Sequence, residues 1–242
     1  MAATLQHRTD KKRGRFITLE GGEGVGKSTQ ARMLAERLAL RGFECITTRE
    51  PGGSPGAEKL RTILLSGAVQ PLGPMAEALL FAAARIDHLD KTIRPALARG
   101  AFVICDRFTD STRAYQGALG NIDARQIRAL EEITVGPTRP DLTFMLDLPV
   151  EIGLARAKAR RGAEAVDRFE GEDVDFHNGL RRAFRDIAEA EPQRCHIIDA
   201  QRSPQEISDA IWRIVEKQLL PSRKRKSGDS APGANRGEMA KT

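Results

Sequence analysis

The stretch LEGGEGVGKSTQ, residues 19–30, has the residue types of a loop that binds phosphate. It matches the pattern G-x-x-x-x-G-K-[ST] at Gly21, Gly26, Lys27 and Ser28. An apolar run precedes it and a segment with helical spacing follows, which is the context that the pattern requires. Glycine lets successive backbone N–H groups approach a polyphosphate that side chains would block. The stretch therefore predicts a nucleoside triphosphate site; the alternative is a glycine-rich turn between a strand and a helix.

Each part of this loop has a use in binding a nucleoside triphosphate. A helix that begins near Lys27 would point the positive end of its dipole at the phosphates. Lys27 would add a positive charge for the β- and γ-phosphates, and the hydroxyl of Ser28 can ligate Mg²⁺. We therefore predict a nucleoside triphosphate and Mg²⁺ as ligands. The residues expected to bind ATP are Gly21, Gly22, Glu23, Gly24, Val25, Gly26, Lys27, Ser28 and Thr29.

Glu23 is the unexpected residue of this loop, because a carboxylate inside a phosphate site repels the ligand. Its side chain would have to face away from the nucleotide, towards a second substrate. An acid beside such a site is a candidate functional residue. The alternative is an exposed loop acid without a function.

Charged residues follow two of the apolar runs at the point where a strand would end. Asp106 is the last residue of the run FVICD and Arg107 follows it, while Arg49 follows the run ECITT. Ligands of open α/β sheets bind at the carboxyl ends of strands. Asp106 could order Mg²⁺ there, while Arg107 could neutralise phosphate oxygens. Arg49 is a second candidate for binding phosphate, and Glu50 could hold the side chain of Arg49 in place. The alternative for Asp106 is an ion pair with its own neighbour.

Phe81 and Arg85 lie four residues apart in LLFAAARIDH, and therefore on one face of a helix. A phenylalanine offers a flat surface to a nucleobase, and an arginine offers donors to carbonyl oxygens. The alternative is a phenylalanine in the core and a solvated arginine. The stretch STRAYQG adds hydroxyl and amide groups that suit a base edge or a sugar, unless it is only a polar helix start. These groups belong to Thr112, Tyr115 and Gln116.

Residues 156–170 are rich in positive charge. They follow the fourth apolar run, where a segment could fold over the phosphates as a lid. An arginine lid would exclude water and supply charge to the transition state. The alternative is a solvated helix face. The basic residues are Arg156, Lys158, Arg160, Arg161 and Arg168.

Five short apolar runs alternate with longer segments of helical spacing. The runs are apolar almost throughout, as are strands that are buried on both faces. We predict an α/β fold with a five-stranded parallel sheet and helices on both faces. The runs cover residues 16–19, 44–48, 102–106, 142–148 and 195–199.

The net charge of +6 is concentrated at the two ends of the 242-residue chain. Residues 1–15 and 221–242 each carry +4, which leaves −2 for residues 16–220. We therefore predict disordered basic tails, and a central domain that does not bind nucleic acid.

No apolar run is long enough to span a membrane, and the N-terminus has no apolar signal core. Three widely spaced cysteines without a CxxC pair favour reduced thiols in a cytoplasmic protein.

Together these motifs resemble the thymidylate kinase family, from residue 16 to about 200. The resemblance is carried by FITLEGGEGVGKST, TREPGG, FAAAR, CDRF, STRAYQG and LDL with its arginine-rich follower. It implies a P-loop nucleoside monophosphate kinase fold that dimerises through helices. It also implies phosphorylation of dTMP to dTDP by ATP with Mg²⁺. Residues 16–220 would be the kinase domain, with a lid at about 156–170.

The resemblance implies a role for each residue that would bind dTMP. Glu23 would accept the 3′-hydroxyl, Phe81 would stack on thymine, and Arg85 would bond a thymine carbonyl. Thr112 would reach the base edge, while Tyr115 would lie against C2′ and disfavour a ribose hydroxyl. The residues expected to bind dTMP are Glu23, Arg49, Phe81, Arg85, Arg107, Thr112, Tyr115 and Gln116.

The resemblance also implies how phosphate and metal are held. Arg49 and Arg107 would grip the acceptor phosphate, with Asp106 on the magnesium side. Some members of the family place a catalytic arginine directly after the loop acid, where this chain has Gly24. Bacterial members use the lid, which is the arrangement expected here. Arg113 stands where the family pattern has glutamine. The predicted catalytic residues are Lys27, Arg107, Arg160 and Arg161, and the predicted metal ligands are Ser28 and Asp106.

Three other functions need to be distinguished from this one. A kinase of another small acceptor would have no need of Glu23 together with Phe81 and Arg85. A GTP-specific switch protein would carry the tetrapeptide N-K-x-D, which the sequence lacks. A basic nucleic-acid adaptor conflicts with the charge of the central domain, and salt-dependent DNA binding would test for it.

Overall fold

The computed structural model of the protein describes residues 13–161 and 168–220. Residues 1–12 and 221–242, where we predict basic tails, lie outside the described part. So do residues 162–167 in the middle of the predicted lid.

Five parallel strands form one sheet in the order β2-β3-β1-β4-β5. Each strand falls on one of the predicted apolar runs, which confirms the predicted sheet. Arg15, counted above with the N-terminal segment, is the first residue of β1. Leu19 of β1 lies opposite Asp106 of β3, and Glu20 lies opposite Met145 of β4, so the carboxyl ends of neighbouring strands are level. The strands are β1 (Arg15–Glu20), β2 (Cys45–Arg49), β3 (Phe102–Asp106), β4 (Leu142–Asp147) and β5 (Cys195–Asp199).

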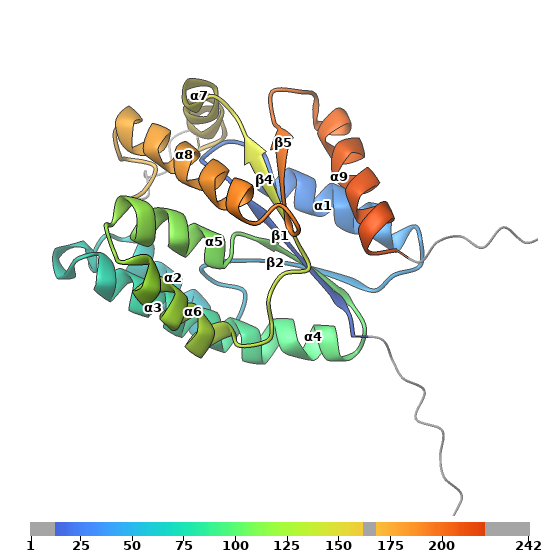
Figure 1. Ribbon diagram of the computed structural model, residues 1–242, viewed down its shortest axis with the longest axis horizontal. Helices are drawn as coiled ribbons and strands as arrows, with labels where there is room; N and C mark the ends of the chain where they lie inside the picture. The colour runs from blue at the N-terminus through green and yellow to red at the C-terminus, as the bar shows by residue number, and fades with distance from the viewer. Residues whose placement is uncertain (1–12, 162–167, 221–242) are drawn as a thin grey trace, which may run out of the picture.

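Helices connect the strands and cover both faces of the sheet, as Figure 1 shows. No helix in the described part of the chain is both long and apolar enough to cross a membrane. Besides α-helices, residues 13–161 and 168–220 form one 3₁₀ turn, η1, and two π-helical segments, η2 and η3. The helical elements are α1 (Lys27–Ala39), α2 (Pro55–Leu65), η1 (Gln70–Leu72), α3 (Pro74–His88), η2 (Leu89–Ile93), α4 (Arg94–Ala98), α5 (Thr109–Thr112), η3 (Arg113–Leu119), α6 (Ala124–Val135), α7 (Val150–Arg161), α8 (Val174–Ala190) and α9 (Pro204–Gln218).

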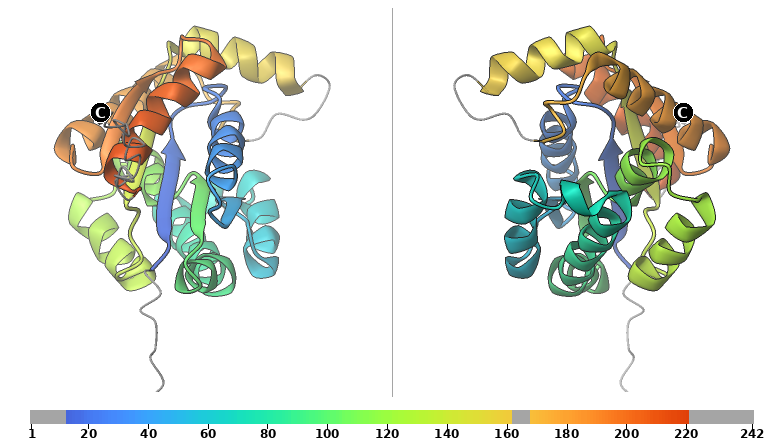
Figure 2. Two further views of the ribbon diagram at one scale, coloured as in Figure 1. Left: turned by 90° about the vertical axis from the view of Figure 1, so that its right-hand side faces the viewer. Right: turned by 90° about the vertical axis from the view of Figure 1, so that its left-hand side faces the viewer.

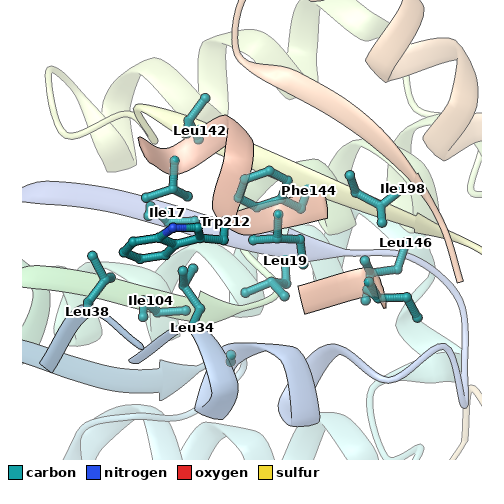
Figure 3. Packing of buried hydrophobic residues seen from close by; sticks show 14 of the residues in the cluster. Ile17, Leu19, Leu34, Leu38, Ile104, Leu142, Phe144, Leu146, Ile198 and Trp212 are labelled. Carbon is teal, nitrogen blue, oxygen red and sulfur yellow. The ribbon is translucent and has the colours of Figure 1, made fainter. Parts of the chain in front are cut away.

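The core is built where helices bury apolar side chains of the strands. On one face α1 and α9 pack against the sheet, and Trp212 of α9 lies near Leu34 of α1 and Ile17 of β1 (Figure 3). On the other face Phe16 of β1 packs edge to face with Phe108, at 4.9 Å between ring centroids. Because both faces are covered, the inner strands β1, β3 and β4 are buried almost throughout, whereas the edge strands β2 and β5 keep exposed residues. This rigid sheet holds the residues at its carboxyl edge.

The helix α7 occupies a special position. In both views of Figure 2 it lies beyond the end of the sheet towards which the strands point. The loop between β1 and α1 emerges at this same edge. The carboxyl edge of the sheet is therefore where the candidate residues must be sought.

All three cysteines are free thiols. Cys105 and Cys195 are buried and Cys45 is half-buried. Burial raises the pKa of Cys45 to about 11 and that of Cys195 to about 12. These thiols stay protonated at neutral pH, as unreactive structural cysteines do.

Candidate active site

The loop between β1 and α1 has a backbone that requires glycine. The φ angles of Gly21, Gly24 and Gly26 are 132°, 66° and 96°, which residues with a Cβ rarely adopt. A Cβ added at Gly22 or Gly26 would meet no atom within 4 Å. The space beside the loop is therefore open to a ligand, and the N-terminus of α1 faces the same loop.

Lys27, the first residue of α1, folds its side chain back across this loop. Its Nζ donates to the carbonyl oxygens of Gly22 at 2.7 Å and Gly21 at 3.2 Å. Burial and the charge of Arg107 lower the pKa of Lys27, while Glu23 opposes them. A polyphosphate along the loop would add negative charge and favour the ammonium form.

Ser28 and Asp106 join the start of α1 to the end of β3. The Ser28 hydroxyl donates to Asp106 Oδ2 at 2.5 Å. Hydroxyl and carboxylate oxygens suit Mg²⁺, which usually keeps several waters and binds phosphate oxygens as well. Within residues 13–161 and 168–220, no group of three or more His, Cys, Asp or Glu side chains could hold a metal ion. The donor set thus fits Mg²⁺ that arrives with a polyphosphate.

A cavity of about 470 Å³ extends from the phosphate loop to aromatic side chains of α3 and η3. Its volume lies in the range of small-molecule sites. Gly21, Gly22 and Val25 do not line it, and the side chain of Arg161 lies outside the described part. All other predicted site residues do: Glu23, Gly24, Gly26, Lys27, Ser28, Thr29, Arg49, Phe81, Arg85, Asp106, Arg107, Thr112, Tyr115, Gln116 and Arg160.

Arg107 has a left-handed backbone conformation with φ 68°, which is uncommon for a residue with a side chain. This turn brings its guanidinium to the carbonyl of Gly21 at 2.9 Å and to the carboxylate of Glu23 at 2.5 Å. The guanidinium also lies over the ring of Tyr115, 5.4 Å from its centroid. Arg107 therefore stands between the phosphate loop and the aromatic half of the cavity.

The carboxylate of Glu23 faces this junction. It contacts Arg107, and the hydroxyl of Tyr115 donates to it at 3.4 Å. Burial alone would raise the pKa of Glu23, but Arg107 and Lys27 outweigh burial and lower it to about 2. Glu23 is thus ionised at neutral pH and accepts hydrogen bonds in the cavity.

Glu20, which we did not select from the sequence, fixes the turn that carries Arg107. Its buried carboxylate accepts from the backbone N–H of Phe108 at 2.7 Å and from the hydroxyl of Ser111 at 2.6 Å. Burial, reinforced by the charge of Asp110, raises the pKa of Glu20 to about 7. The only feature of the sequence that could have indicated a role for Glu20 is its position as an acid at the end of an apolar strand.

Arg85 is buried, so the solvated alternative for this side chain is wrong. Its Nε donates to Glu50 at 2.7 Å, and its Nη2 donates to the hydroxyl of Thr112 at 3.1 Å. The other oxygen of Glu50 lies 3.0 Å from Nδ1 of His88. The guanidinium is therefore held rigidly at the wall of the cavity.

The predicted support of Arg49 by Glu50 is wrong. Arg49 instead forms two hydrogen bonds with Glu58, at 3.0 and 3.1 Å. Successive side chains of an extended chain point to opposite sides, so neighbours such as these do not meet. Glu50 turns into the protein towards Arg85, whereas Arg49 remains exposed at the cavity.

Three aromatic rings meet at the far end of the cavity. Phe169 lies 5.1 Å from Tyr115 and 6.3 Å from Phe81, between ring centroids. Sequence reasoning missed Phe169, because it belongs to a turn before α8 and not to a periodic element. Gln116 is buried nearby, where its amide donates to Glu77 at 3.4 Å.

The helix α7 contacts the phosphate loop through glycine. A Cβ added at Gly24 would lie 2.0 Å from the carbonyl oxygen of Gly153, so a side chain does not fit there. Near the end of α7, Arg160 points a mostly exposed guanidinium to Glu170 at 3.5 Å.

Arg113 in η3 stands where the family pattern has glutamine. Its guanidinium pairs with Asp110 at 3.0 Å and with Glu191.

Comparisons with known proteins identify the family. The family model "Thymidylate kinase" matches residues 19–211. A thymidylate kinase of Rhodopseudomonas palustris is 59% identical over 209 residues, which cover 86% of this chain and 91% of the relative. One of Bradyrhizobium diazoefficiens is 57% identical over 87% of this chain and 92% of its own length.

A solved structure is also similar. Thymidylate kinase from Ehrlichia chaffeensis aligns with a TM-score of 0.69 and 33% identity, over 84% of this chain and 99% of the other. The strand order, the phosphate loop and the relatives all agree with the resemblance found in the motifs. The fold is that of a P-loop nucleoside monophosphate kinase, and the chain belongs to the thymidylate kinase family.

Proposed function

We propose that this protein transfers the γ-phosphate of ATP to the phosphate of dTMP and so forms dTDP. The observation that carries the proposal is that a continuous cavity joins the phosphate loop to the pocket around Phe81 and Arg85. Two nucleotides in this cavity would meet phosphate to phosphate over the N-terminus of α1. The rate would come from positioning and charge neutralisation, without a covalent intermediate.

The donor nucleotide is expected along residues 21–29. The backbone N–H groups and the start of α1 would bind its phosphates, with Lys27 adding a charge. Ser28 and Asp106 would hold Mg²⁺, which neutralises phosphate oxygens when it is bound. Their present hydrogen bond at 2.5 Å places the two oxygens side by side.

The pyrimidine would occupy the aromatic half of the cavity. Phe81 offers the surface on which thymine would stack, and Arg85 would donate to a thymine carbonyl. Arg85 is already aligned by its hydrogen bonds, so little entropy is lost when it binds. Thr112 and Gln116 would face the base edge, and Tyr115 would lie against C2′ of the sugar.

The sugar hydroxyl and the acceptor phosphate would bind near the phosphate loop. Glu23 would accept the 3′-hydroxyl, a bond that its ionised carboxylate strengthens. Arg107 and Arg49 would hold the phosphate. Arg107 pairs with Glu23, so both groups already lie at this place. When dTMP binds, Arg107 would contact its phosphate and Glu23 would contact its 3′-hydroxyl.

We assign transition-state charge neutralisation to Lys27, Arg107 and an arginine of the lid, Arg160 or Arg161. The contact of Gly24 with α7 favours a lid arginine, since the loop position has no room for a side chain. Arg160 lines the cavity, and its charge helps to lower the pKa of Glu23. Residues 16–220 would act as one kinase domain.

We further propose a cytoplasmic homodimer. The outer face of α3 exposes Met75, Leu79 and Ile86, spaced as one helical stripe. Neighbouring α2 and α6 expose Ile63 and Ile133. A second copy of this chain would cover these apolar side chains, and sedimentation at different concentrations would detect it. The free thiols are typical of a reducing compartment.

The acceptor decides between this function and the kinase of another small molecule. The test measures transfer of labelled γ-phosphate, with Mg²⁺ present, to dTMP, dUMP, AMP and shikimate in separate reactions. We expect dTMP to have the highest kcat/KM. Preference for AMP would overturn the proposal. Slow ATP hydrolysis that dTMP leaves unchanged would instead indicate a switch protein.

A further inference from the structure

The wall of the acceptor pocket that Phe169 provides needs an anchor. Phe169 belongs to a turn between α7 and α8, whereas Phe81 and Tyr115 are carried by the helical elements α3 and η3. A turn has few backbone hydrogen bonds to fix it. The position of this ring must therefore depend on side-chain contacts made by the same turn.

Glu77 of α3 provides such a contact. It forms an ion pair with Arg168, the residue directly before Phe169. The two side chains are only 6% and 16% exposed, so water screens the pair little. The guanidinium of Arg168 also lies over the ring of Phe169, 4.6 Å from its centroid.

The same carboxylate connects further parts of the pocket. Glu77 lies one helical turn before Phe81, so both project from the same face of α3. Its second oxygen accepts from the amide of Gln116 in η3. One buried acid thus joins three elements that surround the proposed pyrimidine site.

We propose that Glu77 is a positioning residue for the acceptor: through Arg168 it fixes Phe169 as a wall of the pyrimidine pocket. The inference rests on the proposed function and adds a specificity element to it. Glu77 does not line the cavity, so it acts through its neighbours and not by touching the nucleotide. Loss of the anchor should weaken dTMP binding and leave the ATP half of the cavity unchanged.

Four variants test this inference: Glu77→Gln, Arg168→Met, Phe169→Ala, and Glu77→Gln combined with Phe169→Ala. The Michaelis constants for dTMP and ATP are measured separately, each at saturating co-substrate, with thermal unfolding as a check on the fold. The matched control is Glu36→Gln, which breaks an exposed ion pair with Arg32 on α1, away from the cavity.

We expect each single variant to raise KM for dTMP about tenfold, the equivalent of 1.4 kcal/mol. In these variants KM for ATP should change less than about twofold. In the control Glu36→Gln both Michaelis constants should change less than about twofold. Because Glu77 acts through Phe169, the double variant should be no worse than Phe169→Ala alone. If Glu77→Gln does not fold, Arg168→Met replaces it in the double variant.

The inference is overturned if KM for dTMP does not change, if both Michaelis constants rise together, or if the double variant shows the product of the single effects. The proposed function fails in a different way. It fails if the unaltered protein does not phosphorylate dTMP, whereas an active protein with insensitive variants refutes only the role of Glu77.

Discussion

The carboxylate of Glu23 and the guanidinium of Arg107 meet at 2.5 Å, although the two residues lie 84 positions apart in the chain. One comes from the phosphate loop and the other from the end of β3, so the contact marks the junction of the two halves of the cavity. Both are proposed ligands of dTMP. Their pairing holds two opposite charges ready at the place where a sugar hydroxyl and a phosphate would arrive.

Replacing Glu23 should remove recognition of the 3′-hydroxyl. A hydrogen bond to a charged group contributes about 1.5–3 kcal/mol, so the protein should prefer dTMP over its 3′-deoxy analogue by about tenfold or more. Glu23→Ala should reduce this ratio of kcat/KM values to about one. An unchanged ratio in the variant would mean that Glu23 does not contact the hydroxyl.

Removing the ammonium group of Lys27 should stop turnover without unfolding the protein. Lys27→Ala loses the charge that would bind the β- and γ-phosphates. Among the described residues its hydrogen bonds reach two loop carbonyls, so the fold does not depend on it. The measurements are single-turnover phosphate transfer and a circular dichroism melt. Retained turnover would show that the loop does not handle phosphate.

Asp106 should determine how much Mg²⁺ the reaction needs. Asp106→Asn keeps the shape of the side chain but removes the charge beside Ser28, so metal binding should weaken. The Mg²⁺ concentration for half-maximal rate should rise severalfold at saturating dTMP, while KM for dTMP should change little. The same Mg²⁺ requirement in both proteins would exclude Asp106 from the metal site.

Arg85 should contribute more to stability than Arg49, although both pair with a glutamate. Arg85→Met leaves Glu50 buried without its guanidinium partner, which typically costs about 3–5 kcal/mol. Arg49→Met is the matched control, since its pair with Glu58 is exposed and worth about 1 kcal/mol or less. Urea unfolding of both variants provides the comparison. Equal losses would contradict the buried position of Arg85.

Glu20 should make stability depend on pH. Its pKa in the folded state is raised from 4.5 to about 7 by burial and by Asp110. Between these values the unfolded chain releases the proton first, so the free energy of unfolding falls as pH rises. Glu20→Gln removes this slope. The stability of the variant relative to the original should therefore increase from pH 4.5 to 7; a constant difference would contradict the raised pKa.

The sequence predicted the sheet well, because its signals are local. The five apolar runs and the loop pattern around Lys27 need only neighbouring residues to be recognised, and every run became a strand. The rule that ligands bind at the carboxyl edge of such a sheet then indicates that functional residues lie at the strand ends. This rule alone predicts Asp106 and Arg107 beside the phosphate loop, where both make hydrogen bonds to it or to the start of α1.

The missed residues depend on contacts between distant parts of the chain. Glu20 accepts a hydrogen bond from Phe108, 88 positions later, and Glu77 pairs with Arg168 from a turn without periodic pattern. Nothing near these residues in the sequence reveals such partners. The error at Glu50 was avoidable, because Glu50 directly follows β2 and successive side chains of an extended chain point to opposite sides.

The most direct test of the central claim is a crystal structure of the protein soaked with dTMP. The account predicts the thymine ring against Phe81, a thymine carbonyl within hydrogen-bond distance of Arg85, and the phosphate directed to the loop before Lys27. Electron density that places the base elsewhere, or an empty cavity at saturating dTMP, would contradict it.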